Sequence, residues 1–115
     1  MIKQSGTFVF ANPELIEDVE PGIKRQMLGY GPNLMAVKVW FDKGAVGYVH
    51  EHLHSQVTYV HSGEFEVVID GETKLLKEGD SFYIEPHLSH GAVCTKPGVL
   101  IDMFSPLRED FLKEK

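Results

Sequence analysis

The sequence is short of cysteine, of long apolar runs and of positive charge, and each shortage excludes a class of protein. The single cysteine, Cys94, cannot form an intramolecular disulfide or a two-cysteine metal site. It is expected to be a small buried hydrophobic residue in a reducing compartment. No stretch is long and apolar enough to predict a membrane-spanning helix, and residues 1–10 lack the features of a secretory signal. We therefore expect a cytoplasmic protein.

Acidic side chains outnumber basic ones by 17 to 11, which gives a net charge of −6 at neutral pH. Basic patches with interleaved aromatic residues are typical of nucleic-acid binding, and the sequence contains none. Neither a nucleic acid nor a membrane is therefore an expected partner. Because the overall charge repels anions, an anionic small molecule would have to be bound by local arginines.

What the sequence does contain is a series of short runs rich in β-branched and aromatic residues. They recur about every eight to twelve residues with turn signals between them, which is typical of a β-sandwich or β-barrel. The 115 residues provide room for one domain, residues 1–115. The runs expected to be strands cover residues 7–10, 34–41, 57–61, 64–69, 73–76, 81–84, 91–95 and 99–104.

Turn and cap residues mark several boundaries of the predicted elements. Asp70-Gly71 favours a tight hairpin, because both residues accept the positive φ angles of a type I′ turn. Ser62-Gly63 is expected to end a strand. Residues 105–112 are expected to form a short C-terminal helix, with Ser105 as its cap and Pro106 as its first residue.

All 6 histidines lie between His50 and His90, and their spacing predicts a metal site. In a β-strand, alternate residues share a face, so His50 and His52 would lie side by side, roughly 7 Å apart along the backbone. His90 follows a second turn-rich segment and can supply another nitrogen. Gln56 can join them only if residues 53–55 bend. These four side chains are expected to hold one divalent ion.

A site of three histidines and one glutamine consists of neutral ligands, which leave the charge of the ion at +2. Such an ion favours binding of an anionic or carbonyl-bearing molecule as a Lewis acid. The ligand set does not distinguish Zn, Ni, Mn, Fe and Co. His54 is expected either beside the ligands or facing outward, and His61 and His87 at the surface or in packing.

Two stretches of the sequence resemble the two motifs of the cupin superfamily. The first, residues 44–63, carries the first two histidines and Gln56, where many cupins have Glu. The second, residues 79–86, is followed by His90 and Gly91. The resemblance implies an all-β fold, a small single-domain cupin or jelly-roll β-barrel, here with a short C-terminal helical turn.

A narrower resemblance is to the pectin-degradation cupins of the KdgF type. It rests on residues 50–56, 63–66 and 100–111, with residues 24–26 and 29–31 in addition. The resemblance implies a metal-dependent, non-redox enzyme acting on 4,5-unsaturated monouronates, which pectin or alginate lyases release. Its implied product is the linear 4-deoxy-5-keto-uronate.

The last predicted strand offers a candidate acid–base group. Leu100, Asp102 and Phe104 share one face, and if that face lines the barrel, burial raises the pKa of a carboxyl group suited to proton transfer. The alternative is an outward-facing Asp102. Phe104 is expected to pack against the sugar ring. Arg108 or Arg25 is expected to pair with the substrate carboxylate, the alternative for both being a surface salt bridge.

The fold alone does not determine chemistry, so two other functions remain candidates at this stage. One is a metal-dependent dioxygenase or a sugar isomerase, and the other is a non-catalytic cupin that binds a small molecule. A homodimer is the expected assembly, formed by exchange of an N-terminal strand.

Overall fold

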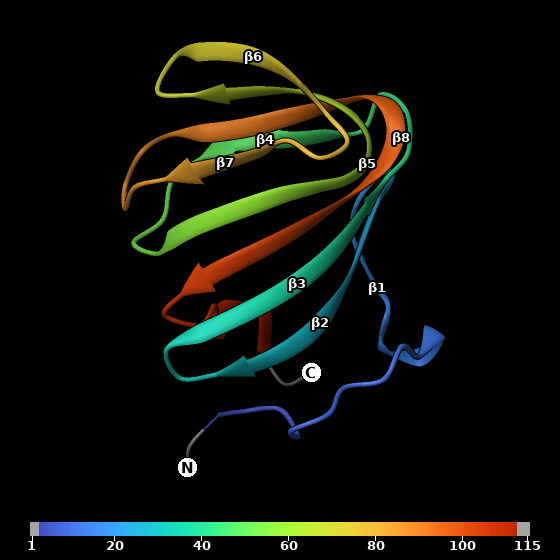
Figure 1. The fold of residues 1–115 in the computed structure, drawn as a ribbon, viewed down its shortest axis with the longest axis vertical. Coiled ribbons are helices and arrows are strands. Elements are labelled where there is room, and N and C mark those ends of the chain that lie inside the picture. The colour runs from blue at the N-terminus through green and yellow to red at the C-terminus, as the bar shows by residue number, and fades with distance from the viewer. Residues whose placement is uncertain (1–2, 113–115) are drawn as a thin grey trace.

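The strands form an antiparallel jelly roll in which two long strands belong to both layers (Figure 1). The computed structural model describes residues 3–112, and within this range it contains eight strands. The elements are η1 (Pro13–Leu15), β1 (Glu17–Glu20), β2 (Ile23–Gly31), β3 (Leu34–Phe41), β4 (Val46–His50), β5 (Ser55–Ile69), β6 (Glu72–Lys77), β7 (Ser81–Ile84), β8 (His90–Ser105) and η2 (Glu109–Leu112).

The long strands β5 and β8 pair with each other along most of their lengths. At one end they are flanked by β7 and β3, and at the other by β6 and β4. The prediction that residues 57–61 and 64–69, and likewise 91–95 and 99–104, form separate strands is therefore wrong. Each pair is one continuous strand, and the prediction that Ser62-Gly63 ends a strand is wrong as well.

The bend in these strands depends on two glycines that pack against each other. A Cβ atom on Gly63 would lie 2.5 Å from the Cα of Gly98, and Gly63 has a φ of +82°. The β5–β8 register also shifts on both sides of Ser62. Because neither glycine carries a side chain, the two backbones approach closely and the strand pair bends without ending.

The Asp70-Gly71 hairpin is confirmed. It joins β5 to β6, and the φ angles of the two residues are 49° and 82°, as a type I′ turn requires. The alternating burial of β3 is also the pattern expected of a strand with one face toward a core.

Two predictions for the chain ends need correction. Residues 7–10 form no strand, and the side chains of Phe8 and Phe10 are 80% and 79% exposed, since no neighbouring strand pairs with them. Ser105 does not cap a helix, because it is the last residue of β8 and pairs with Ser55. The predicted C-terminal helical turn exists, but it is the 3-10 turn η2.

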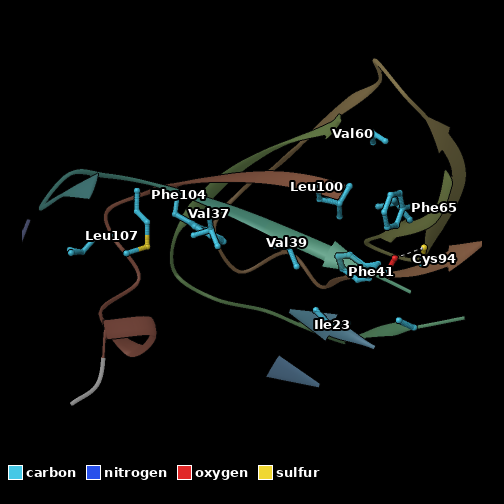
Figure 2. Packing of buried hydrophobic residues seen from close by; sticks show 13 residues of the cluster. Ile23, Val37, Val39, Phe41, Val60, Phe65, Cys94, Leu100, Phe104 and Leu107 are labelled. Atoms are coloured by element: carbon cyan, nitrogen blue, oxygen red, sulfur yellow. Dashed lines mark hydrogen bonds between the residues drawn. The ribbon is translucent and has the colours of Figure 1, made fainter. Parts of the chain in front are cut away.

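The apolar core fills the space between the two layers (Figure 2). Phe41 and Phe65 meet edge to face with ring centroids 5.1 Å apart. Cys94 is buried beside them, as predicted. Leu107, beyond β8, closes the opposite end of this core. Among residues 3–112 no helix is long and apolar enough to cross a membrane.

Candidate metal centre

Three histidines converge at one end of the molecule. His50 ends β4 and His90 begins β8, and the two are paired in the ladder between these strands. His52 lies just beyond β4, so the prediction that it shares a strand with His50 is wrong. The chain nevertheless brings its ring to within 4.7 Å of the His90 ring, measured between centroids. One ring nitrogen from each histidine lies within 4.8 Å of the others.

Backbone carbonyls determine which nitrogen of each imidazole is free. The Nδ1 atoms of His50, His52 and His90 lie 2.8, 3.1 and 2.9 Å from the carbonyl oxygens of Tyr48, His54 and Leu88, respectively. A carbonyl oxygen only accepts hydrogen bonds, so each Nδ1 carries the proton and donates it. The Nε2 atom of each neutral ring is left with a lone pair. This arrangement is typical of histidines that bind a metal through Nε2.

Gln56 reaches the same centre, because residues 53–54 bend the chain as predicted. Its amide nitrogen donates to the Thr58 hydroxyl at 2.9 Å, which directs the carbonyl oxygen toward the histidines. That oxygen lies 2.9 Å from His52 Nε2. Since His52 donates through Nδ1, two lone pairs face each other across this gap.

A cation fits this arrangement of donors. It removes the repulsion between the two facing lone pairs, and two atoms bound at about 2.1 Å and at right angles lie about 3.0 Å apart. His90 Nε2 is buried and has no hydrogen-bond partner among the described residues. A buried nitrogen left without a partner is costly unless it has a ligand. The donor set therefore suits a transition metal.

Burial keeps two of the three imidazoles neutral. The pKa of His90 is lowered to about 4, chiefly by removal of the ring from water, against the opposing effect of the Leu88 carbonyl. The pKa of His52 is lowered for the same main reason. A neutral imidazole is the form that binds a metal, so both rings are ready for ligation at neutral pH.

Asp102 points inward from β8, as predicted, and is directly opposite Thr58 in the ladder. Its Oδ1 accepts a hydrogen bond from the Thr58 hydroxyl at 2.6 Å. Burial raises the pKa of Asp102 to about 6, although the Thr58 hydrogen bond and the positive charge of Arg108 act in the opposite direction. A carboxyl group with a pKa near neutrality is suited to both accepting and donating a proton.

These groups face a cavity of about 380 Å³, a volume typical of small-molecule sites. Its wall is largely apolar and includes the side chains of Val37, Val39 and Leu100. The polar and aromatic residues that line it include His50, Gln56, His90, Asp102, Phe104, Arg25, Arg108 and Phe111.

Comparisons with known proteins agree with this geometry. Residues 37–104 match the family model described as a cupin domain. The chain belongs to the cupin family. Pectin degradation protein KdgF from Dickeya dadantii is 48% identical over 98 residues, which cover 84% of this cupin and 89% of that protein.

Solved structures extend the comparison. The structure of KdgF from Halomonas sp. has a TM-score of 0.86 and 48% identity, and the match covers 93% of this cupin and 99% of that chain. An RmlC-like cupin from Shewanella frigidimarina has a TM-score of 0.90 and 61% identity, and the match covers 94% and 97% of the two chains. A salicylate 1,2-dioxygenase from Pseudaminobacter salicylatoxidans is only 22% identical and shares the fold alone, with a TM-score of 0.70.

One wall of the cavity in this cupin holds two arginines against one aromatic ring. The Arg25 and Arg108 guanidinium carbons lie 3.9 and 4.2 Å from the centroid of Phe111. Each arginine also forms an ion pair, Arg25 with Glu17 and Arg108 with Asp110. The predicted salt bridges thus exist, but both arginine side chains are mostly buried and line the cavity.

Phe104 is nearly inaccessible to solvent, because aromatic rings surround it. Its ring meets those of His52, His54 and Phe111 edge to face, with centroids 5.8, 6.3 and 5.7 Å away. The Arg108 guanidinium carbon lies 5.1 Å from its centroid. Phe104 therefore joins the histidine centre to the arginine wall.

His54 is buried with its ring centroid 5.4 Å from that of His52, so of the two expected positions the one beside the ligands is confirmed and the outward-facing one is not. Its Nε2 donates to the carbonyl oxygen of Leu107 at 3.1 Å, which ties the start of β5 to the C-terminal segment. His61 and His87 are exposed, as predicted.

Two residues of the site, Thr58 and Phe111, were not predicted from the sequence. Thr58 contacts the candidate groups only through the β5–β8 register, and Phe111 only through the return of the C-terminal segment. The alternation of Gln56 and Thr58 on one face of a strand was the available signal for the first. No spacing in the sequence marked the second.

Proposed function

We propose that this cupin is a KdgF-type enzyme that converts 4,5-unsaturated monouronates from pectin or alginate breakdown into linear 4-deoxy-5-keto-uronates. The observation that carries the proposal is the presence of three convergent histidines and a carboxyl group of raised pKa in one cavity. The 48% identity to the pectin degradation protein KdgF of Dickeya dadantii supports the choice of substrate.

His50, His52, Gln56 and His90 are the proposed ligands of one divalent ion, Zn, Ni, Mn, Fe or Co. The free Nε2 atoms and the orientation of the Gln56 amide support this assignment. When bound, the ion supplies a Lewis acid that attracts the carboxylate and ring oxygens of the uronate. The reaction is non-redox, so the ion needs no change of oxidation state.

Asp102 is the proposed proton-transfer group. The substrate is an enol ether, and its ring opens after a proton adds to C4 and water adds to C5. The C5 hydroxyl of the resulting hemiketal then loses its proton and the ring oxygen gains one as its bond to C5 breaks, so that C5 becomes the open ketone. C1, left as a hydrated aldehyde, releases one water. A carboxyl group with a pKa of about 6 can donate the first proton and accept one when the hemiketal collapses.

Phe104, Arg108 and Arg25 are the proposed substrate-binding residues. Phe104 is almost wholly covered, so it can offer the sugar ring only the apolar edge that lines the cavity. A guanidinium group can pair with the uronate carboxylate through two parallel hydrogen bonds. Glu17 holds the guanidinium group of Arg25, and Asp110 holds that of Arg108. Both guanidinium groups pack against the Phe111 ring. Either arginine can provide the pair.

The proposed assembly is a homodimer and the proposed compartment is the cytoplasm. Phe8 and Phe10 project from the N-terminal segment with about four fifths of each side chain exposed, which favours a partner for that segment. The buried thiol of Cys94, whose pKa is raised by burial, suits a reducing compartment.

The test of the function is direct. Purified protein is mixed with unsaturated galacturonate or with unsaturated monouronate from alginate, and the ultraviolet absorbance of the double bond is followed with and without a chelator. The proposal predicts metal-dependent loss of absorbance with no oxygen uptake. Tight uronate binding without absorbance loss would instead indicate a binding protein, and oxygen consumption by the iron-loaded protein would indicate a dioxygenase.

A further inference from the structure

Thr58 lies between the metal centre and the candidate proton-transfer group. Its side chain is completely buried on the inner face of β5, two residues after Gln56. In the ladders it is opposite Asp102 of β8 on one side and Phe82 of β7 on the other. Its hydroxyl group contacts both polar neighbours, Gln56 Nε2 at 2.9 Å and Asp102 Oδ1 at 2.6 Å.

The chemistry of these three groups gives the hydrogen bonds one direction. An ionised carboxylate only accepts, so the Thr58 hydroxyl donates its single proton to Asp102. The hydroxyl oxygen can then only accept from Gln56, which must present its NH₂ group. The amide oxygen of Gln56 is thereby directed to the opposite side, where it lies 2.9 Å from His52 Nε2.

Without the hydroxyl group, little else determines the orientation of the amide. The remaining contact of Gln56 Nε2 is with Asp102 Oδ1 at 3.5 Å, at the limit of a hydrogen bond. A rotation by 180° would then present the NH₂ group to the histidines. An amide nitrogen with two protons has no lone pair for a metal, so the rotated side chain is not a ligand.

We propose that Thr58 is a positioning residue, which holds the Gln56 oxygen toward the three histidines and the Asp102 carboxylate toward the cavity. The inference rests on the proposed function, since it takes Gln56 as a metal ligand and Asp102 as the proton-transfer group. It adds the residue that links the two. Thr58 lies inside the first motif, residues 44–63, but at a position between Gln56 and Gly63 for which the motif specifies no residue type.

The competing explanation is that Thr58 only fills space among buried side chains. Two substitutions separate the roles. Thr58→Val keeps nearly the same volume and removes the hydroxyl, whereas Thr58→Ser keeps the hydroxyl and removes a methyl group. A positioning role makes valine the damaging change, and a packing role makes serine the damaging change.

The measurement is the affinity of the full chain for Co²⁺, obtained by competition with a chelator, together with the visible spectrum of the bound ion. Loss of a residue that orients a metal ligand typically weakens binding about 10- to 100-fold, so Thr58→Val should show a loss of that order and an altered spectrum. Thr58→Ser should remain within about threefold of the wild type and retain its spectrum. Circular dichroism and thermal melting of each metal-free variant serve as controls for folding.

The outcomes distinguish this inference from the proposed function. Loss of affinity in Thr58→Val alone supports the positioning role even if the wild type does not act on uronates. Equal affinity and spectrum in all three proteins, or a loss confined to Thr58→Ser, overturns it. A wild type that binds no Co²⁺ overturns it together with the metal centre. Where uronate turnover is found, kcat at saturating metal should fall in Thr58→Val with KM nearly unchanged.

Discussion

His50 and His90 are paired residues of the β4–β8 ladder, and their rings lie 4.4 Å apart between centroids. They lie 40 residues apart in the sequence, yet the register of the two strands makes them neighbours. The same ladder directs both rings toward His52. The convergence of the three histidines thus depends on strand pairing and not only on their local spacing.

The first prediction concerns the ligands. His52→Ala should lower metal content and uronate turnover together. Loss of a residue that only hydrogen-bonds to a metal ligand typically costs about 10- to 100-fold in affinity or activity, and loss of a ligand itself should cost more. His61→Ala is the matched control, because His61 is exposed on β5 and should leave both unchanged. Metal content is measured by elemental analysis after dialysis. A metal-free but active His52→Ala protein would refute the Lewis-acid role.

The second prediction separates proton transfer from metal binding. Asp102→Asn keeps the size of the side chain and a carbonyl oxygen for the Thr58 hydroxyl. Turnover should fall by about 10²- to 10⁴-fold, the contribution typical of a general acid or base. Metal affinity and thermal stability should stay close to those of the wild type. Normal turnover in this variant would remove Asp102 from the mechanism.

The third prediction follows from the raised pKa of Asp102. In metal-free protein its carboxyl group should titrate near pH 6, and added Zn²⁺ should lower that pKa because a nearby cation favours the carboxylate. Carbon-13 NMR of the labelled carboxyl group measures both values, with Asp102→Asn identifying the signal. An Asp102 that titrates near its ordinary value without metal would show that burial does not act on it.

The same shift has a consequence for stability, with a defined sign. Because the pKa is higher in the folded state, the protonated carboxyl group favours folding below about pH 4, and this contribution is lost as pH rises through about 6. Over this pH range, the free energy of unfolding of the metal-free wild type should therefore fall by up to about 3 kcal/mol relative to that of Asp102→Asn. The decrease is smaller if water in the cavity solvates the carboxylate. Urea unfolding at several pH values measures the difference.

The fourth prediction tests the bend of the long strands. A Cβ atom on Gly98 would collide with the backbone of Ser62 and Gly63, so Gly98→Ala should lower the free energy of unfolding by about 1–3 kcal/mol or more. Gly31→Ala is the matched control, since nothing lies within 4 Å of a Cβ there. Urea denaturation compares the two. Equal stability of both variants would mean that the glycine contact does not determine the bend.

Local patterns indicated three of the candidate ligands, His50, His52 and Gln56, and placed Asp102 on one face with Leu100 and Phe104, while leaving open whether that face points inward. Histidine spacing, the need for a bend before Gln56 and the alternation of residues 100–104 all concern neighbours in sequence. The Asp70-Gly71 turn was equally local, because its φ angles depend on those two residues. Such features are fixed by steric preferences that operate within a few residues.

Features that depend on register or on distant contacts could not be predicted in this way. Ser62-Gly63 has the composition of a turn, but Gly98 opposite it allows the strand to continue through a bend. The burial of His54 depends on the Leu107 carbonyl, which only the folded C-terminal segment brings near. Phe8 and Phe10 have strand-forming side chains but lack a neighbouring strand within the described chain.

The most direct test of the central claim is anomalous diffraction at the absorption edge of a metal bound to the protein. We expect one anomalous peak bonded to an Nε2 atom of each of His50, His52 and His90 and to Oε1 of Gln56, with Asp102 facing it across the cavity. A peak elsewhere, or a peak whose ligands exclude these histidines, would contradict the account.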